Sequence, residues 1–121
     1  MNLDNQNEAR SIISKLLFPD TAFYNCKNKT LYIIEKKEQK CSGSVDEKLQ
    51  TCDFKLRQYK RLVEGTVGRR KFQINHVEYF FILNNYFEER KDGEYRDVLQ
   101  YIREIGCQYY FNKITIKELG L

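Results

Sequence analysis

Two acidic residues and a lysine have a spacing along the chain that suits hydrolytic chemistry. Asp20 follows Pro19, and Glu35 and Lys37 come directly after the apolar run 31–34. Two carboxylates can hold a divalent cation, and a lysine can orient an attacking water, so together they are the minimal equipment for metal-assisted phosphodiester hydrolysis. This chemistry requires the chain between them to bring the three side chains together.

The intervening chain reads as a hairpin of two strands joined by a polar turn. The segments 21–26 and 30–36 are the expected strands, and 27–29 is the expected turn. Antiparallel pairing brings Asp20 beside the end of the second strand in any plausible register. Directly opposed side chains share a face, so Asp20 joins the face of Glu35 only if the turn has two or four residues. The second strand is apolar on both faces, which predicts a central position in its sheet.

These segments resemble the PD-(D/E)XK nuclease superfamily, which includes most type II restriction endonucleases and several repair and junction-cleaving nucleases. The matching residues are Pro19-Asp20, the stretch 31–39 (LYIIEKKEQ) and the stretch 43–48 (GSVDEK). The first two match the defining pattern of the superfamily. The third is similar to a subgroup of small restriction-enzyme-like proteins, where it opens the helix after the catalytic strand.

The resemblance implies roles for individual residues. Asp20 and Glu35 would bind the metal, which is expected to be Mg²⁺ with Mn²⁺ as a substitute, and Lys37 would orient or activate the attacking water. Gln39 continues a Glu-X-Lys-X-Gln pattern that many relatives share, which implies a contact with phosphate or with the lysine. The alternative is that Gln39 is a solvated residue beyond the strand end. An acid on the first helix often joins the metal site in the superfamily. Glu8 is therefore a third candidate ligand, and its alternative is an acid favoured by the helix dipole.

Length and composition predict one nuclease-sized domain over residues 1–121. A chain of 121 residues can form a single core, and one proline and six glycines leave no linker. The net charge of +4 and the pI near 8.8 suit a DNA partner. The polar N-terminus predicts no signal peptide, and the run 79–83 is too short to span a bilayer. We therefore expect a soluble cytoplasmic protein with no membrane association.

The cysteines and the single histidine offer little competing chemistry. The four cysteines are too few and too irregularly spaced for a disulfide framework, and Cys52 and Cys107 occupy apolar positions typical of small buried residues. A zinc site from Cys41, Cys52 and His76 matches no structural zinc spacing. No local motif places a nucleophile beside His76, so we expect it to be a polar residue at the start of a strand rather than a general base.

The remaining hydrophobic patterns predict the scaffold around the hairpin. The further expected elements are a helix over 5–17, a long helix from 45 to 63 or 64, a strand over 77–83, a helix over 94–105 and a strand over 107–111. A capping box at 44–47 begins the long helix, and Asp92 and Gly106 bound the later one. The resulting α-β-β-α-β-α-β order predicts an α/β fold with a restriction-endonuclease-like core, a mixed β-sheet flanked by helices. The third strand usual in the first meander of the superfamily has no identifiable counterpart.

Cations gather on the predicted long helix and on the glycine-bearing loop that follows it. The expected nucleic-acid contacts, beside Gln39, are Lys48, Lys55, Arg57, Arg69, Arg70 and Lys71. Lys48 is close enough in sequence to the catalytic strand to reach the scissile phosphate. The alternative for the whole series is a solvated basic face.

The combined prediction is a magnesium-dependent endodeoxyribonuclease similar to small type II restriction enzymes. It would act on DNA as a homodimer, because one compact active site cuts one strand and a symmetric pair cuts both. A structure-specific junction or flap repair nuclease is the first alternative and would prefer branched DNA of any sequence. A catalytically silent nucleic-acid-binding module is the second.

Overall fold

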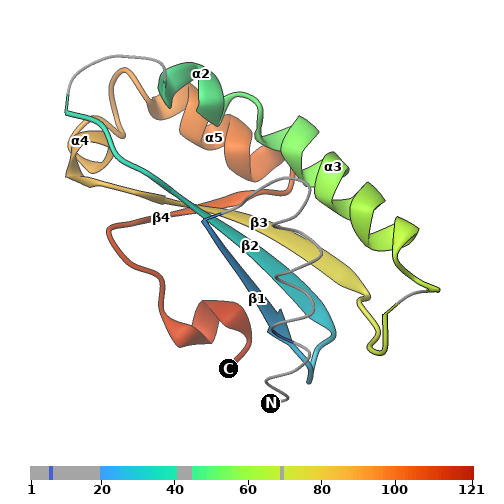
Figure 1. The fold of residues 1–121 in the computed structure, drawn as a ribbon. Helices are drawn as coiled ribbons and strands as arrows, with labels where there is room; N and C mark the ends of the chain where they lie inside the picture. Colours follow the sequence, from blue (N-terminus) through green and yellow to red (C-terminus); the bar gives the residue numbers. More distant parts are fainter. Residues whose placement is uncertain (1–5, 7–19, 41–44, 69) are drawn as a thin grey trace.

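The computed structural model describes residues 6, 20–40, 45–68 and 70–121. Its elements in chain order are β1 (Thr21–Asn25), β2 (Thr30–Lys37), α2 (Val45–Leu49), α3 (Cys52–Gly65), β3 (His76–Leu83), α4 (Asn85–Glu88), α5 (Arg96–Glu104), β4 (Gln108–Phe111) and the 3₁₀ helix η1 (Ile116–Leu119) (Figure 1). Some predicted features lie outside the described residues. They are the helix over 5–17, of which only Gln6 is described, the candidate ligand Glu8 on that helix, and the residues Cys41, Ser44 and Arg69.

One mixed sheet organises the described chain. Its strand order is β1-β2-β3-β4, with β1 antiparallel to β2 and with β2, β3 and β4 mutually parallel. The predicted α/β class is therefore confirmed as a four-stranded mixed sheet with flanking helices, and β2 is an inner strand as predicted. Among the helices that the structure describes, none has the length and apolar character needed to cross a membrane.

The hairpin of β1 and β2 has the register that the site requires. Thr21 lies opposite Ile34, and the four residues 26–29 form the turn. The turn is one residue longer than expected, because Cys26 leaves the first strand. The next position outward along this ladder sets Asp20 opposite Glu35, as an even-numbered turn predicts.

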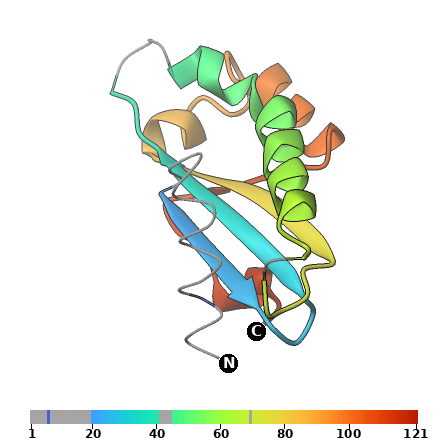
Figure 2. The same cartoon turned by 45° about the vertical axis from the view of Figure 1, so that its right-hand side comes forward.

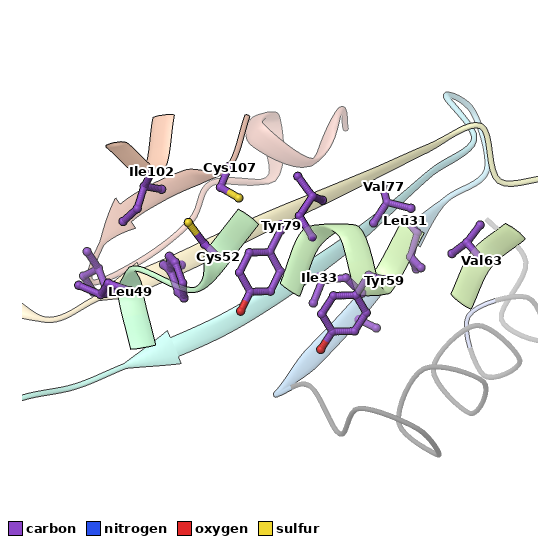
Figure 3. Close-up of a cluster of buried hydrophobic side chains, with 14 of the residues drawn as sticks. Leu31, Ile33, Leu49, Cys52, Tyr59, Val63, Val77, Tyr79, Ile102 and Cys107 are labelled. Atoms are coloured by element: carbon purple, nitrogen blue, oxygen red, sulfur yellow. The ribbon is translucent and has the colours of Figure 1, made fainter. Parts of the chain in front are cut away.

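The sheet has helices on one face and the C-terminal segment on the other (Figures 1 and 2). On the helix side, alternate strand residues meet the buried stripes of α3 and α5 in the main core (Figure 3). A smaller cluster on the opposite face contains Tyr32, Ile34, Phe80 and Leu119. Because side chains alternate along β2, Glu35 and Lys37 lie on the helix side, in line with the buried Ile33.

The long helix predicted from 45 to 63 or 64 is two helices. The break lies between Leu49 and Cys52, where the Thr51 hydroxyl donates to the Lys48 carbonyl at 2.8 Å. Such a local side-chain bond offers the backbone an alternative to the helical pattern. The apolar stripe nevertheless continues across the break, and its buried members are Leu49, Cys52, Leu56, Tyr59 and Val63. Periodicity thus identified the buried face correctly but not the continuity of the helix.

The second half of the chain follows the predicted order with local corrections. The last helix begins at Arg96 with Tyr95 at its N-cap, so the prediction of Asp92 as the cap is wrong. Gly106, with a φ of 92°, follows the helix end as predicted, and β3 begins at His76. The helices α4 and η1 were not expected, because each has only four residues and shows no measurable periodicity.

Replacement of Gly120 by alanine is expected to destabilise the fold. Gly120 has a φ of +78°, and an added Cβ would lie 2.5 Å from Asn28 Nδ2 and 3.0 Å from Asn25 Nδ2. The buried Asn25 cannot withdraw freely, because its Nδ2 donates to the Leu119 carbonyl at 2.8 Å. The left-handed backbone alone costs about 1–2 kcal/mol for a non-glycine residue. Denaturant unfolding measures the loss, and Gly93→Ala, whose Cβ would meet nothing nearer than 3.8 Å, is the control expected to show little change.

Candidate functional site

Glu35 and Lys37 form a partly buried ion pair at the carboxyl end of β2. Lys37 Nζ lies 3.2 Å from Glu35 Oε2, and the two side chains are 22% and 14% exposed respectively. The pair stands beside Phe81 and Leu83 of the parallel neighbour β3. Removing two charges from water contributes little net stability unless their geometry is very favourable, so the pair is a candidate for a functional site.

Two buried tyrosines lie beside the carboxylate of Glu35 on the core side. The Tyr59 hydroxyl, on α3, donates to Glu35 Oε1 at 3.5 Å, and Tyr79, on β3, stacks on the Tyr59 ring close to the same carboxylate. Burial, and after it the charge of Glu35, raises the pKa of both phenols well above the usual range. Both hydroxyls therefore stay protonated and keep a proton to donate.

Sequence reasoning did not assign these tyrosines to the site. Tyr59 lies within the long helix predicted from 45 to 63 or 64, and Tyr79 begins the apolar run 79–83. The available signal was chemical, because a tyrosine hydroxyl at a fully buried position needs a hydrogen-bond partner. That requirement predicts a polar partner for each hydroxyl but does not identify Glu35, because the packing of α3 and β3 beside β2 decides which polar group is near.

Asp20 lies beside the pair at the rim of the sheet. Its side chain is exposed, and its Oδ2 accepts a hydrogen bond from the Lys36 backbone N–H at 2.8 Å. Burial and the charge of Glu35 raise the pKa of Tyr59 most, and the negative charge of Asp20 raises it further. Asp20 therefore acts electrostatically on a residue on the helix side of the sheet. It also lines a surface hollow with Ile34 and Lys36 on the opposite face. The structure therefore brings Glu35 and Lys37 into contact and leaves Asp20 adjacent to them.

The oxygen donors of this site fit a hard divalent cation that shares its coordination with substrate. Mg²⁺ is commonly held by one or two carboxylates, completed by waters and substrate phosphates, and Asp20 and Glu35 provide such a pair. Within the described residues, no group of three or more His, Cys, Asp or Glu side chains is arranged to enclose a metal. That finding also gives no support to a zinc site at Cys52 and His76. Glu8, the proposed third ligand, lies outside the described residues.

Gln39 is a structural anchor and not a solvated residue. Its Nε2 donates to Asp46 Oδ1 at 3.0 Å and to the Tyr95 hydroxyl at 2.9 Å, and its backbone exchanges hydrogen bonds with the Asn84 side chain. The solvated interpretation is wrong, because only 8% of Gln39 is exposed. The geometry also gives no support to a contact between Gln39 and phosphate. Its donor nitrogen Nε2 is already hydrogen-bonded, and its buried, unpaired Oε1 is an acceptor, as the phosphate oxygens are.

Arg70 has a role in the scaffold. Its Nη1 donates to the Val63 carbonyl at 2.6 Å and to the Thr66 hydroxyl at 2.8 Å, so its guanidinium satisfies the C-terminal end of α3. These bonds hold the group against the helix and reduce its availability for phosphate. Lys48 and Lys71 are exposed, and their contacts with DNA stay predictions.

The cations of α3 lie on different flanks of the helix. Tyr59 marks the flank that faces Glu35, and Lys60 lines a groove beside β3 on the other flank. Lys55 precedes Tyr59 by four residues, so helical periodicity places it on the Tyr59 flank, where it is half-buried. Arg57 forms an exposed ion pair within α3 at 3.3 Å. Of these cations, Lys55 is the one best placed toward the carboxylates.

Comparison of the chain with protein-family models, with curated proteins and with solved structures found no match. The function has to be inferred from the chain's own residues and their geometry.

Proposed function

We propose that this protein is a magnesium-dependent endodeoxyribonuclease of the type II restriction-endonuclease kind, built on a restriction-endonuclease-like core. The observation that carries this proposal is the Glu35–Lys37 ion pair of 3.2 Å at the end of an inner strand, with Asp20 just before β1 accepting a hydrogen bond from the Lys36 backbone. Stability alone does not explain the cluster, because apolar residues at the same positions would avoid the desolvation of the charges. Two carboxylates that can hold a cation and a lysine that can orient water are sufficient equipment for metal-assisted attack on a phosphodiester.

In this proposal each side chain has a separate task. Asp20 and Glu35 provide carboxylate oxygens for the cation, and Mg²⁺, when bound, polarises the scissile phosphate and stabilises the charge that develops on it. Lys37 donates a hydrogen bond to the attacking water and orients it toward the phosphorus. The ion pair with Glu35 holds the Lys37 ammonium in place before DNA arrives. The expected products carry a 5′ phosphate.

The decisive experiment compares three substrates with the purified protein. Supercoiled plasmid, linear duplex and a branched junction are each incubated with Mg²⁺ and with chelator. Fixed fragments from linear duplex support restriction-type cleavage, whereas cleavage confined to the junction, whatever its sequence, supports a structure-specific repair nuclease. A folded protein that binds all three and cuts none would be a binding module. Cleavage of both strands at one site needs two active sites, so we also propose a homodimer, which sedimentation equilibrium tests.

Lys55→Met is expected to weaken DNA binding, while Lys60→Met is not. Methionine keeps most of the apolar stem and removes only the charge, and the two lysines lie on opposite flanks of α3. Binding is measured without cleavage in Ca²⁺ over a series of salt concentrations. Loss of one phosphate contact should flatten the log–log slope by about one unit for Lys55→Met. Equal slopes for the two variants would contradict the assignment of the Tyr59 flank to DNA.

A further inference from the structure

We propose that Tyr59 and Tyr79 are positioning residues that fix the carboxylate of Glu35 in the orientation needed to bind the cation. This inference rests on the proposed function and adds two residues to its machinery. Neither tyrosine belongs to the pattern of acidic and basic residues from which that function was inferred.

The contacts of Glu35 come from three different elements. Lys37 on β2 approaches Oε2 at 3.2 Å, and the Tyr59 hydroxyl on α3 approaches Oε1 at 3.5 Å. Tyr79 on β3 stacks on Tyr59 and lies close enough to the same carboxylate for the charge of Glu35 to raise its pKa. A carboxylate side chain offers about four lone-pair sites, so the two donors leave about two for a cation. The donors thereby determine the side from which a metal can approach.

The two phenols are themselves rigidly held. Tyr59 is fully buried and Tyr79 is 2% exposed, and their rings are stacked with centroids 5.8 Å apart. Both rings lie between α3 and the sheet, with their hydroxyls pointing to the same side (Figure 3). Because both rings are buried, the groups beside Glu35 on the core side are held by packing, and Lys37 alone approaches the carboxylate from a partly exposed position. The packing of α3 on the sheet is thereby coupled to the geometry of the site.

A simpler role would be structural, in which Glu35 merely satisfies two buried hydroxyls. The two roles predict different losses when a hydroxyl is removed. A structural role lowers only the free energy of unfolding, because a hydrogen bond is lost. A positioning role also lowers the affinity for the cation and the turnover number, since a misoriented carboxylate binds the metal less well.

The test uses Tyr59→Phe and Tyr79→Phe, which remove a hydroxyl and keep the ring. Mn²⁺ affinity is measured by calorimetry without DNA, and kcat and KM are measured for DNA cleavage. Loss of an orienting partner of a metal ligand typically costs about 10- to 100-fold in affinity or activity, and we expect this loss in Mn²⁺ affinity and kcat with KM for DNA unchanged. Tyr110→Phe is the matched control, because its hydroxyl donates to Glu118 at 3.0 Å in a tyrosine–glutamate pair remote from Glu35.

The outcomes separate this inference from the function on which it rests. If the wild-type protein binds Mn²⁺ and cuts DNA, and both folded variants match it in affinity and kcat, the positioning role is refuted and the nuclease proposal stands. If the wild-type protein neither binds Mn²⁺ nor cuts DNA, both proposals fail. Should Tyr59→Phe not fold, Tyr79→Phe decides the question, since it removes the other hydroxyl beside the same carboxylate.

Discussion

Lys37→Ala is expected to abolish cleavage of DNA while leaving the binding of DNA nearly intact. The ammonium of Lys37 is proposed to orient the attacking water, a contribution worth about 10²- to 10⁴-fold in rate for a positioned proton-transfer or water-orienting group. Circular dichroism checks that the variant is folded, because removal of Lys37 leaves the carboxylate of Glu35, which is 14% exposed, without its ion-pair partner. Single-turnover cleavage in Mg²⁺ and binding in Ca²⁺ measure the two quantities separately.

The neighbouring lysine is the matched control for this prediction. Lys36 is 63% exposed, pairs with Glu38 at 3.1 Å and alternates to the other face of β2. Lys36→Ala should therefore cleave DNA much more like the wild-type protein than Lys37→Ala does. A folded Lys37→Ala protein that cuts at the wild-type rate would show that the catalytic centre lies elsewhere.

Asp20→Asn, which keeps the size of the side chain, should instead lower Mn²⁺ affinity together with cleavage.

Ile33→Ala is expected to cause a large loss of folding stability. Ile33 is fully buried on β2, with β1 on one side and β3 on the other, and its side chain lies in the main core under α3. Truncation of a buried isoleucine to alanine removes apolar contacts and leaves a cavity, which costs about 2–5 kcal/mol. Equilibrium unfolding in urea measures the change.

Ile116→Ala provides the comparison, because Ile116 is 70% exposed at the start of η1. The same chemical truncation there should change stability by no more than about 0.5 kcal/mol. Similar losses for the two variants would mean that β2 is not the centre of the core, and the burial argument for Glu35 and Lys37 would lose its basis.

Local sequence patterns were sufficient for much of the fold. The apolar run 31–34 predicted an inner strand, and the hydrophobic pattern from 45 to 63 or 64 predicted the helical region that contains α2 and α3. Gly106 predicted the end of α5, because a left-handed backbone after a helix favours glycine. The pairing of Asp20 with the end of β2 was also foreseeable, since a short hairpin allows only a few registers. Each of these features depends on residues close together in the chain.

Tertiary structure alone decided which polar groups meet across the core. Tyr59 and Tyr79 reach Glu35 only because α3 packs over β2 and β3, and Gln39 is buried only because Asp46 and Tyr95 converge on it from α2 and the start of α5. Hydrophobic periodicity reports which face of an element is buried, but it carries no information about the partner of a buried hydroxyl or amide. That partner is set by the packing of elements distant in sequence, where a buried polar group must find a hydrogen bond or destabilise the fold.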